Sequence, residues 1–518
     1  MRLPLRHPST SRFRLALGSA IAAGLLVSVG AAPLSASAAP AATHYVNCAA
    51  KTNGDGSSEA KAWNSISSVT KHGGFTAGDK ILFKRGTTCK GQLAPTGSGT
   101  ATARNVIGAY GTGARPTIAG GGTANNTGAV QIINQQYWTV QDLHITNATK
   151  SANPTTYRSG LLFFNSGVGR LAGLTAQRLW IENVRSNPGN GNTRAYGGIS
   201  ALTFGTMKSG FDSLRILNNT VRNVSRTGII SSNAQYPKAY DKDTRIAGNT
   251  VSHARGDGIV LIGAQHGRID DNVVANVGDL GSCAHCGRYG GPSTASAGIW
   301  PSSARYITID HNEVYGTRKA GGDGEAFDID RSSRDVTIQY NYAHDNQGGG
   351  VLLTGARDST IRFNILENNG QGALTFYGKA PSTNTSFYNN TVYLSKASKA
   401  KVVRTFGAIK GSKVSFKNNL VYSYGAGQYQ WPTKKVTTAA NTLLGPLGVG
   451  RPRDAKTSFV NPGLKAPGTG KTGFKSLKGY KPKHPSSFKR GVAIPKSVKV
   501  DIFGKKINPA KPPRGAAG

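Results

Sequence analysis

The stretch Ile216-Leu217-Asn218-Asn219-Thr220-Val221 decides the fold, because its pattern recurs along the middle of the chain. The pattern is an apolar residue, two variable residues, an asparagine, one variable residue and a second apolar residue. Two earlier copies carry Leu143 and Leu179 at the asparagine position. Later copies are centred on Asn249, Asn272, Asn312, Asn341, Asn364, Asn390 and Asn419. The asparagines are 23 to 40 residues apart, and a unit that repeats at such intervals is typical of a solenoid.

A glycine-led apolar run follows five of the asparagine copies after a turn. These runs are Gly228-Ile229-Ile230, Gly258-Ile259-Val260, Gly298-Ile299-Trp300, Gly350-Val351-Leu352 and Gly372-Ala373-Leu374. Each unit is too short for a strand-helix-strand crossover and lacks helical periodicity. The pattern therefore predicts coils of short strands that stack in parallel at about 4.8 Å per coil. The recurring asparagine predicts a ladder of side-chain amides at one corner.

The composition of the 518 residues agrees with many short strands and excludes several other classes. Gly accounts for 68 residues and only 17% of residues are charged, so a large helical protein is disfavoured. The hydrophobic content of 37% excludes a disordered polyelectrolyte and a membrane bundle. The formal net charge is +39. Such a charge predicts attraction to polyanions, and anionic polysaccharide is favoured over nucleic acid because no recognised nucleic-acid motif is present.

The repeats resemble the right-handed parallel β-helix proteins of the pectin lyase-like superfamily, over roughly residues 105–445. The resemblance implies an all-β, single-stranded right-handed parallel β-helix with an N-terminal capping block and an extended basic C-terminal segment. Residues 39–104 are expected to form the cap, with a first strand at His44-Tyr45-Val46 and a short helix opening near Ser65-Ile66. The segment 446–518 is rich in Lys and Pro, and Val500-Asp501-Ile502-Phe503-Gly504 predicts that it is partly docked on the helix.

Residues 1–38 have the features of a secretory signal peptide. Arginines precede an apolar stretch, and Ala36-Ser37-Ala38 supplies small residues for cleavage. We therefore expect a secreted, extracellular and monomeric protein with no membrane span after cleavage. Four cysteines remain, and an oxidising compartment favours disulfides, paired by neighbourhood as Cys48–Cys89 and Cys283–Cys286. The alternative for Cys283 and Cys286 is half of a zinc site, for which no second ligand pair follows.

One segment breaks the chemistry of the repeat by gathering acids. Asp323, Glu325, Asp328 and Asp330 fall within eight residues. Alignment with the neighbouring coils places Phe327 inward, so alternation turns Asp328 and Asp330 outward on one strand. Two such carboxyls lie about 6.5–7 Å apart along a strand, close to the separation found in inverting glycosidases. We expect these four acids to be the catalytic candidates, against the alternative of a solvated or structural cluster.

Neighbouring residues are candidates for binding the substrate. Trp300 is expected beside Asp328 on the outer face, where its ring could stack on a sugar. Arg318, Lys319 and Arg331 flank the acids and are expected to bind substrate carboxylates or lower the pKa of the acids. His344 begins a nearby turn and is a weaker candidate for binding the substrate.

Three functions remain open at this point. The first is acid/base hydrolysis of a polysaccharide with no cofactor. The positive charge of the chain favours an acidic polysaccharide. The second is a metal-assisted lyase of the pectate-lyase type, in which Asp323, Glu325 and Asp328 hold Ca²⁺ and Arg318 or Lys319 acts as the base. The third is a non-catalytic glycan-binding or wall-binding β-helix. The motifs of polygalacturonases are absent at matching places, so the resemblance carries over only the general location of a site.

Overall fold

The computed structural model describes residues 40–149, 155–187, 195–205, 208–279, 296–319, 323–377, 380–406, 411–425, 427–446, 448–484 and 490–518. Within these ranges, Ala41–Gly518 form one compact unit of short strands. No helix in them is long and apolar enough to cross a membrane. The expected signal peptide and the residues Cys283 and Cys286 lie outside the described residues.

The described strands form three sheets in which every named strand pairing is parallel. The largest, called sheet I here, has 18 strands. Its strands are β1 (Thr43–Val46), β2 (Lys80–Lys84), β4 (Asn105–Tyr110), β7 (Trp138–Gln141), β10 (Arg170–Ala172), β11 (Thr175–Gln177), β14 (Gly210–Asp212), β15 (Arg215–Leu217), β18 (Asp241–Lys242), β19 (Arg245–Ala247), β22 (Ala264–Gln265), β23 (Arg268–Asp270), β26 (Arg305–Asp310), β29 (Arg334–Gln339), β32 (Thr360–Arg362), β35 (Thr385–Tyr388), β38 (Val414–Lys417) and β40 (Val436–Ala439).

The other two sheets, called II and III here, have 13 and 10 strands. Sheet II contains β3 (Thr88–Lys90), β5 (Thr117–Ala119), β8 (His144–Asn147), β12 (Trp180–Val184), β16 (Thr220–Val224), β20 (Thr250–Ala254), β24 (Val273–Ala275), β27 (Glu313–Tyr315), β30 (Tyr342–His344), β33 (Ile365–Glu367), β36 (Thr391–Leu394), β39 (Leu420–Ser423) and β41 (Thr442–Leu444). Sheet III contains β6 (Thr127–Ile133), β9 (Arg158–Asn165), β13 (Gly197–Thr203), β17 (Thr227–Asn233), β21 (Ile259–Ile262), β25 (Ile299–Ser302), β28 (Phe327–Ile329), β31 (Gly349–Leu353), β34 (Gly372–Phe376) and β37 (Lys401–Thr405).

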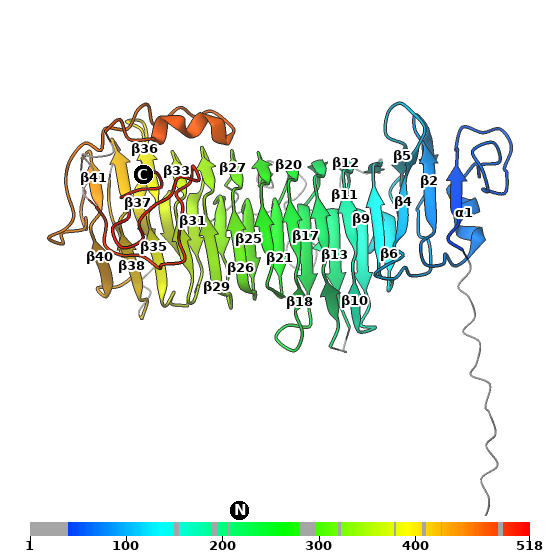
Figure 1. Ribbon diagram of the computed structural model, residues 1–518, viewed down its shortest axis with the longest axis horizontal. Helices are drawn as coiled ribbons and strands as arrows, with labels where there is room; N and C mark the ends of the chain where they lie inside the picture. The colour runs from blue at the N-terminus through cyan, green and yellow to red at the C-terminus, as the bar shows by residue number, and fades with distance from the viewer. Residues whose placement is uncertain are drawn as a thin grey trace, which may run out of the picture. The chain divides into compact units, whose positions relative to one another are not determined.

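The chain visits the three sheets in turn, so that each coil adds one layer to all of them. From β17 in sheet III it passes to β18 and β19 in sheet I, to β20 in sheet II, and returns to sheet III at β21. Figure 1 shows the strands side by side in chain order from β2 to β41. The arrangement of stacked parallel strands predicted by the repeat is confirmed.

The repeated asparagines form a buried ladder at the corner between sheets I and II. Asn312 shows the pattern: its Oδ1 accepts from the backbone N–H of Asn272 at 3.0 Å, and its Nδ2 donates to Oδ1 of Asn341 at 3.0 Å. The ladder runs from Asn219 to Asn441, one copy beyond the last one expected from the sequence. The amides thus satisfy polar backbone groups that the corner buries, as the sequence predicted.

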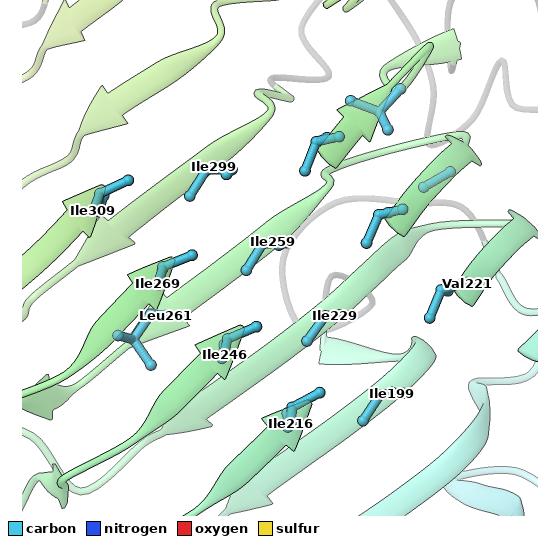
Figure 2. Close-up of a cluster of buried hydrophobic side chains, with 14 of the residues drawn as sticks. Ile199, Ile216, Val221, Ile229, Ile246, Ile259, Leu261, Ile269, Ile299 and Ile309 are labelled. Atoms are coloured by element: carbon cyan, nitrogen blue, oxygen red, sulfur yellow. The ribbon is translucent and has the colours of Figure 1, made fainter. Parts of the chain in front are cut away.

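Apolar side chains from the three sheets fill the space inside the coils. Figure 2 shows a row of isoleucines from sheet I facing a row from sheet III: Ile216, Ile246, Ile269 and Ile309 against Ile199, Ile229, Ile259 and Ile299. Along sheet III the same inward row continues to Phe327 and Val351, which are also fully buried. The predicted inward positions are therefore confirmed.

The N-terminal residues of this unit join the sheets through strand pairing and one disulfide. β1 pairs with β2, and β2 pairs with β4 of the first full coil. The helix α1 (Ile66–His72) begins after Ser65, whose side chain accepts from the backbone N–H of Ser68. A disulfide joins Cys48 to Cys89, which is the pairing expected from the sequence.

The C-terminal residues lie against the outer face of the last coils near sheets I and II. A 3-10 helix, η3 (Phe474–Tyr480), contributes Leu477 and Tyr480 to a second apolar cluster. That cluster also contains Tyr342 and Ile365 from sheet II, together with Ile502 from the end of the chain. The C-terminal segment is therefore docked on the coils.

Candidate functional site

The acidic segment lies on the outer side of sheet III. Backbone pairing places Asp328 between Trp300 and Leu352 in one outward row, which continues through Thr375 to Arg404. A second outward row contains Asp330, whose N–H donates to Pro301 at 3.1 Å, and it continues to Thr354, Tyr377 and Phe406. Asp328 and Asp330 therefore share the outer side of one coil, as their spacing predicted.

The four acids differ in their access to solvent. Asp328 is only 8% exposed, and Glu325 is completely buried. Asp323 and Asp330 are half-buried. Asp323 and Asp330, before and after the short strand β28, are therefore the most open of the four carboxyls.

Glu325 has the most unusual surroundings of the four. Burial first, and the neighbouring Asp323 carboxylate second, raise the pKa of Glu325 to about 8. Neither of its carboxyl oxygens makes a hydrogen bond of acceptable geometry with a described residue, and the nearby amides of Glu325 and Gly349 offset only part of the burial effect. Glu325 therefore keeps its proton at neutral pH.

A buried hydroxyl faces Glu325 across a glycine of the next coil. A side chain at Gly349 would place its Cβ 2.7 Å from Thr375 Oγ1 and 3.3 Å from Glu325 Cγ. Thr375 Oγ1 likewise has no hydrogen-bond partner among the described residues. Because Gly349 has no side chain, three polar oxygens with unused hydrogen-bonding capacity lie close together beneath the outer face.

The cationic residues around the acids lie in different positions. Lys319 is exposed and near enough to Glu325 to oppose the rise in its pKa. Arg318 is exposed and its Nη1 lies 4.0 Å from Oδ1 of Asp279. Arg331 is exposed and directly follows Asp330. Lys319 and Arg331 thus flank the acids, whereas Arg318 faces a separate groove between sheets II and III.

Comparisons with known proteins bear on the fold first. The family model described as "Right handed beta helix region" matches residues 205–392. A GH136 lacto-N-biosidase from Eubacterium ramulus has a similar structure, with a TM-score of 0.61, 18% identity, and coverage of 74% of this chain and 68% of that one. The chain is a right-handed parallel β-helix. The structure of XylC with xylose is also similar, with a TM-score of 0.52, 11% identity, and coverage of 92% and 98% of the two chains.

A sequence relative of this β-helix has a described activity. It is a lacto-N-biosidase of Bifidobacterium longum subsp. longum (strain ATCC 15707 / DSM 20219 / JCM 1217 / NCTC 11818 / E194b), 26% identical over 464 residues. The match covers 73% of this chain and 28% of the relative. The β-helix therefore corresponds to well under half of that longer protein.

The structure corrects the expected role of Trp300 as an open stacking surface. Trp300 is only 4% exposed, and its Nε1 donates to Oδ1 of Asp257 at 2.9 Å. Asp257 also pairs with Arg226 at 2.8 Å, and both side chains are fully buried. The indole is thus part of a buried polar network beside the acids. Its acceptor, Asp257, lies in the turn before β21, 43 residues earlier in the chain.

The structure also corrects the place of His344. It lies in β30 on sheet II, is 2% exposed, and stacks on Tyr342 with ring centroids 4.2 Å apart. Its Nδ1 lies 2.8 Å from Asp345 and its Nε2 3.2 Å from Glu313. Burial lowers the pKa of His344, but these two carboxylates outweigh it and raise the pKa overall. His344 is therefore not part of the outer face of sheet III.

The acids do not form a metal-binding group. No set of three His, Cys, Asp or Glu side chains among the described residues converges on one point, and Asp323, Glu325 and Asp328 are all described. The calcium site considered from the sequence needs these three carboxyls to converge, so their arrangement does not fit it.

Sequence reasoning missed three residues further along the outer side of sheet III. Tyr377 is 42% exposed, and its ring meets that of Phe406 edge to face at 5.4 Å. The Arg404 guanidinium lies 4.0 Å from the Phe406 ring centroid and donates to Oε1 of Gln371 at 2.9 Å. Matching the glycine of each run would have placed Phe376 in the row of Asp330, whereas Gly372 pairs with Gly349 in the structure and brings Tyr377 into that row. No glycine-led run marks β37.

Proposed function

We propose that this β-helix is a glycoside hydrolase that cleaves an oligosaccharide or polysaccharide at Asp323, Glu325, Asp328 and Asp330. The observation that carries the proposal is the pair of outward carboxyls on one coil: Asp328 is nearly buried, Asp330 is half-buried, and their two-residue spacing sets them about 6.5–7 Å apart. Acid/base hydrolysis needs carboxyls whose surroundings separate their protonation states. The similarity to lacto-N-biosidases supports the reaction class.

The burial of each carboxyl suggests its role. Asp328, nearly buried between Trp300 and Leu352, donates the proton to the leaving oxygen. The more open Asp330 activates the water on the same outer face. Asp323 and the neutral Glu325 lie earlier in the segment and act as positioning residues. The export signal expected over residues 1–38 would place this reaction outside the cell.

The aromatic and cationic residues further along sheet III suit a more distant part of the substrate. Tyr377 lies two coils beyond Asp330 in the same row and Phe406 three coils beyond, so about 10–14 Å separates them from the acid. The exposed Tyr377 ring offers a stacking surface for a sugar ring. Arg404 is half-buried and makes no ion pair among the described residues, so it suits an acidic or hydroxyl substituent of that sugar.

The proposal is tested by replacing each acid with its amide. On a substrate found in a reducing-end screen of glycans, Asp328→Asn and Asp330→Asn should each lower turnover on the order of 10²–10⁴. Asp358→Asn, an exposed carboxylate in the turn before β32 of sheet I, is the matched control and should keep full turnover. Tyr377→Ala should chiefly raise KM, because stacking is similar in the ground and transition states.

The pH dependence tests the positioning role of Glu325. Because a charge on the buried Glu325 would disturb the carboxyls that follow it on the same segment, kcat/KM of the unmodified protein should fall above about pH 8. Glu325→Gln should move that alkaline limb in addition to lowering turnover. Full activity in both Asp variants would disprove the site. An unsaturated product that absorbs in the ultraviolet would favour the lyase alternative, and glycan binding without any product would favour the non-catalytic one.

A further inference from the structure

A groove follows the corner at which the strands of sheet II turn into sheet III. The residue at this corner has φ between 53° and 55° in four successive coils, at Asn183, Asn223, His253 and Asn276. All four side chains are exposed. A left-handed corner favours asparagine, and here it turns three amides and an imidazole outward in a row. The strands β12, β20 and β27 that precede the corner lie along the upper edge of Figure 1.

These side chains line one wall of a cavity of about 640 Å³. Three arginines, Arg185, Arg255 and Arg318, line it as well. The cavity is separate from the acid cluster: none of Asp323, Glu325, Asp328 or Asp330 lines it.

The arginines occupy equivalent positions in alternate coils. The N–H of Arg255 donates to Val224 at 3.0 Å, and the N–H of Arg318 donates to Val277 at 2.7 Å. Ser225 and Gly278 fill the same position in the coils between, where they donate to Val184 and Ala254. Because adjacent coils are about 4.8 Å apart, consecutive arginines in the row begin about 9–10 Å apart along the axis.

The groove carries more positive than negative charge. Its one lining acid is Asp279, which lies 4.0 Å from Arg318. The acid nearest to the rim on β12 is Glu182, which is already held by Arg222 at 2.7 Å and by His144 at 3.2 Å. The groove is therefore lined by the exposed Arg185 and Arg318 and the half-buried Arg255, within a chain whose formal net charge is +39.

We propose that this corner groove binds a linear acidic polysaccharide that carries one carboxylate per disaccharide. The distance between successive arginines is close to the length of one disaccharide in an extended glycan, so each guanidinium can meet one carboxylate. The row of exposed amides between them supplies donors and acceptors for the hydroxyls of the intervening sugars. The groove would hold a long chain beside the helix, and its binding does not depend on the hydrolase function proposed above.

The test measures binding of the full chain to oligosaccharides of equal length by calorimetry at low salt. The probe is a hyaluronan oligosaccharide, which has a carboxylate on every second sugar, and the neutral comparison is a chitin oligosaccharide. The double variant Arg185→Gln/Arg255→Gln should bind hyaluronan at least about tenfold more weakly. The matched control is Arg115→Gln/Arg357→Gln, two exposed arginines elsewhere, which should bind within about twofold of the unmodified protein.

The pattern of binding across these variants and glycans separates binding in the groove from a general charge effect. Loss of binding in the groove variant alone, with an unchanged midpoint of thermal unfolding and weaker binding at high salt, supports the proposal. Equal weakening in the control variant would show a general charge effect and overturn it. Equal binding of the chitin oligosaccharide, or tighter binding of a polygalacturonate with a carboxylate on every sugar, would overturn the assigned spacing. Failure here leaves the acid-cluster variants as an independent test of hydrolysis.

Discussion

At the scale of single residues, Glu325 stands out among the four acids because its carboxyl is completely buried. A carboxylic acid is costly to bury as an anion, so the fold keeps it neutral by raising its pKa to about 8 from the usual 4.5. The neighbouring coil contributes Gly349, whose missing side chain leaves room for the carboxyl and for Thr375. Burying this carboxyl thus costs stability at high pH, and the neutral acid that results is a positioning residue in the proposed hydrolysis.

This cost predicts how stability depends on pH. The folded state keeps the Glu325 proton up to about pH 8, whereas the unfolded state loses it near 4.5, so the free energy of unfolding falls as pH rises through that window. The contribution of one such group is at most about 1.4 kcal/mol per pH unit. Glu325→Gln should remove this fall, which denaturant unfolding between pH 4 and 9 would measure.

The exposed Glu59 provides the control for this prediction. Glu59→Gln should leave the pH dependence of stability unchanged. If the Glu325→Gln protein loses stability with pH as steeply as the unmodified protein, the carboxyl is ionised in the folded state and its assigned environment is wrong.

At the scale of the repeated elements, the asparagine ladder specifies the register of the coils. Each amide bonds to the coil before it and to the coil after it, so a shift of one residue would break every rung at once. Leu179 shows how the ladder begins: it has no side-chain amide, but its N–H donates to Oδ1 of Asn219 at 2.9 Å. The ladder therefore tolerates an apolar residue at its first position more readily than in its middle.

Asn312 is the rung that tests this idea. Asn312→Leu would leave the N–H of Asn272 without its acceptor and remove the amide link between the Asn272 and Asn312 side chains, which should cost about 2 kcal/mol or more in unfolding free energy. The same change at the terminal rung, Asn441→Leu, should cost less, because fewer coils depend on it. Chemical denaturation of both variants would measure the difference, and equal losses would contradict a cooperative ladder.

The sequence was a good guide to the coils and a poor one to the site. Local periodicity determines which side chains point inward, so the positions of Ile299 and Phe327 could be predicted. The burial of Trp300 could not, because it depends on Asp257, 43 residues earlier. The place of His344 depends on the sheet that its segment joins, and in the structure that segment is β30 of sheet II.

At the scale of the whole compact unit, the C-terminal segment covers an apolar surface that the coils alone leave open. Glu367 anchors it: its Oε2 accepts from the hydroxyls of Tyr342 at 2.8 Å and Tyr480 at 2.7 Å, and its Oε1 accepts from the N–H of Gly470 at 2.8 Å. A second anchor is Glu313, which accepts from the N–H of Gly473 at 2.7 Å. Two buried carboxylates thus hold the segment by its backbone and one tyrosine.

Glu367→Gln should loosen the segment, because an amide nitrogen cannot accept the hydrogen bonds that a carboxylate oxygen accepts. Loss of charged hydrogen bonds costs about 1.5–3 kcal/mol each, so trypsin should cut at Lys471 and Lys475 on the order of tenfold faster. Asp358→Asn, which alters an exposed carboxyl that accepts from Asn384 away from the segment, should be cut at the rate of the unmodified protein. Equal cutting of all three proteins would show that the segment is held elsewhere.

The docked segment also has a consequence for how the protein is made. During synthesis each new coil can add to the edge of the coil before it, so most of the structure can form in the order in which residues emerge. The apolar surface around Tyr342, Phe363 and Ile365 is different, because the residues that cover it come about 100 positions or more later in the chain. A ribosome-bound chain therefore displays this surface until the covering residues, Leu464 and those after it, have emerged, and during that interval a chaperone would have a defined place to bind.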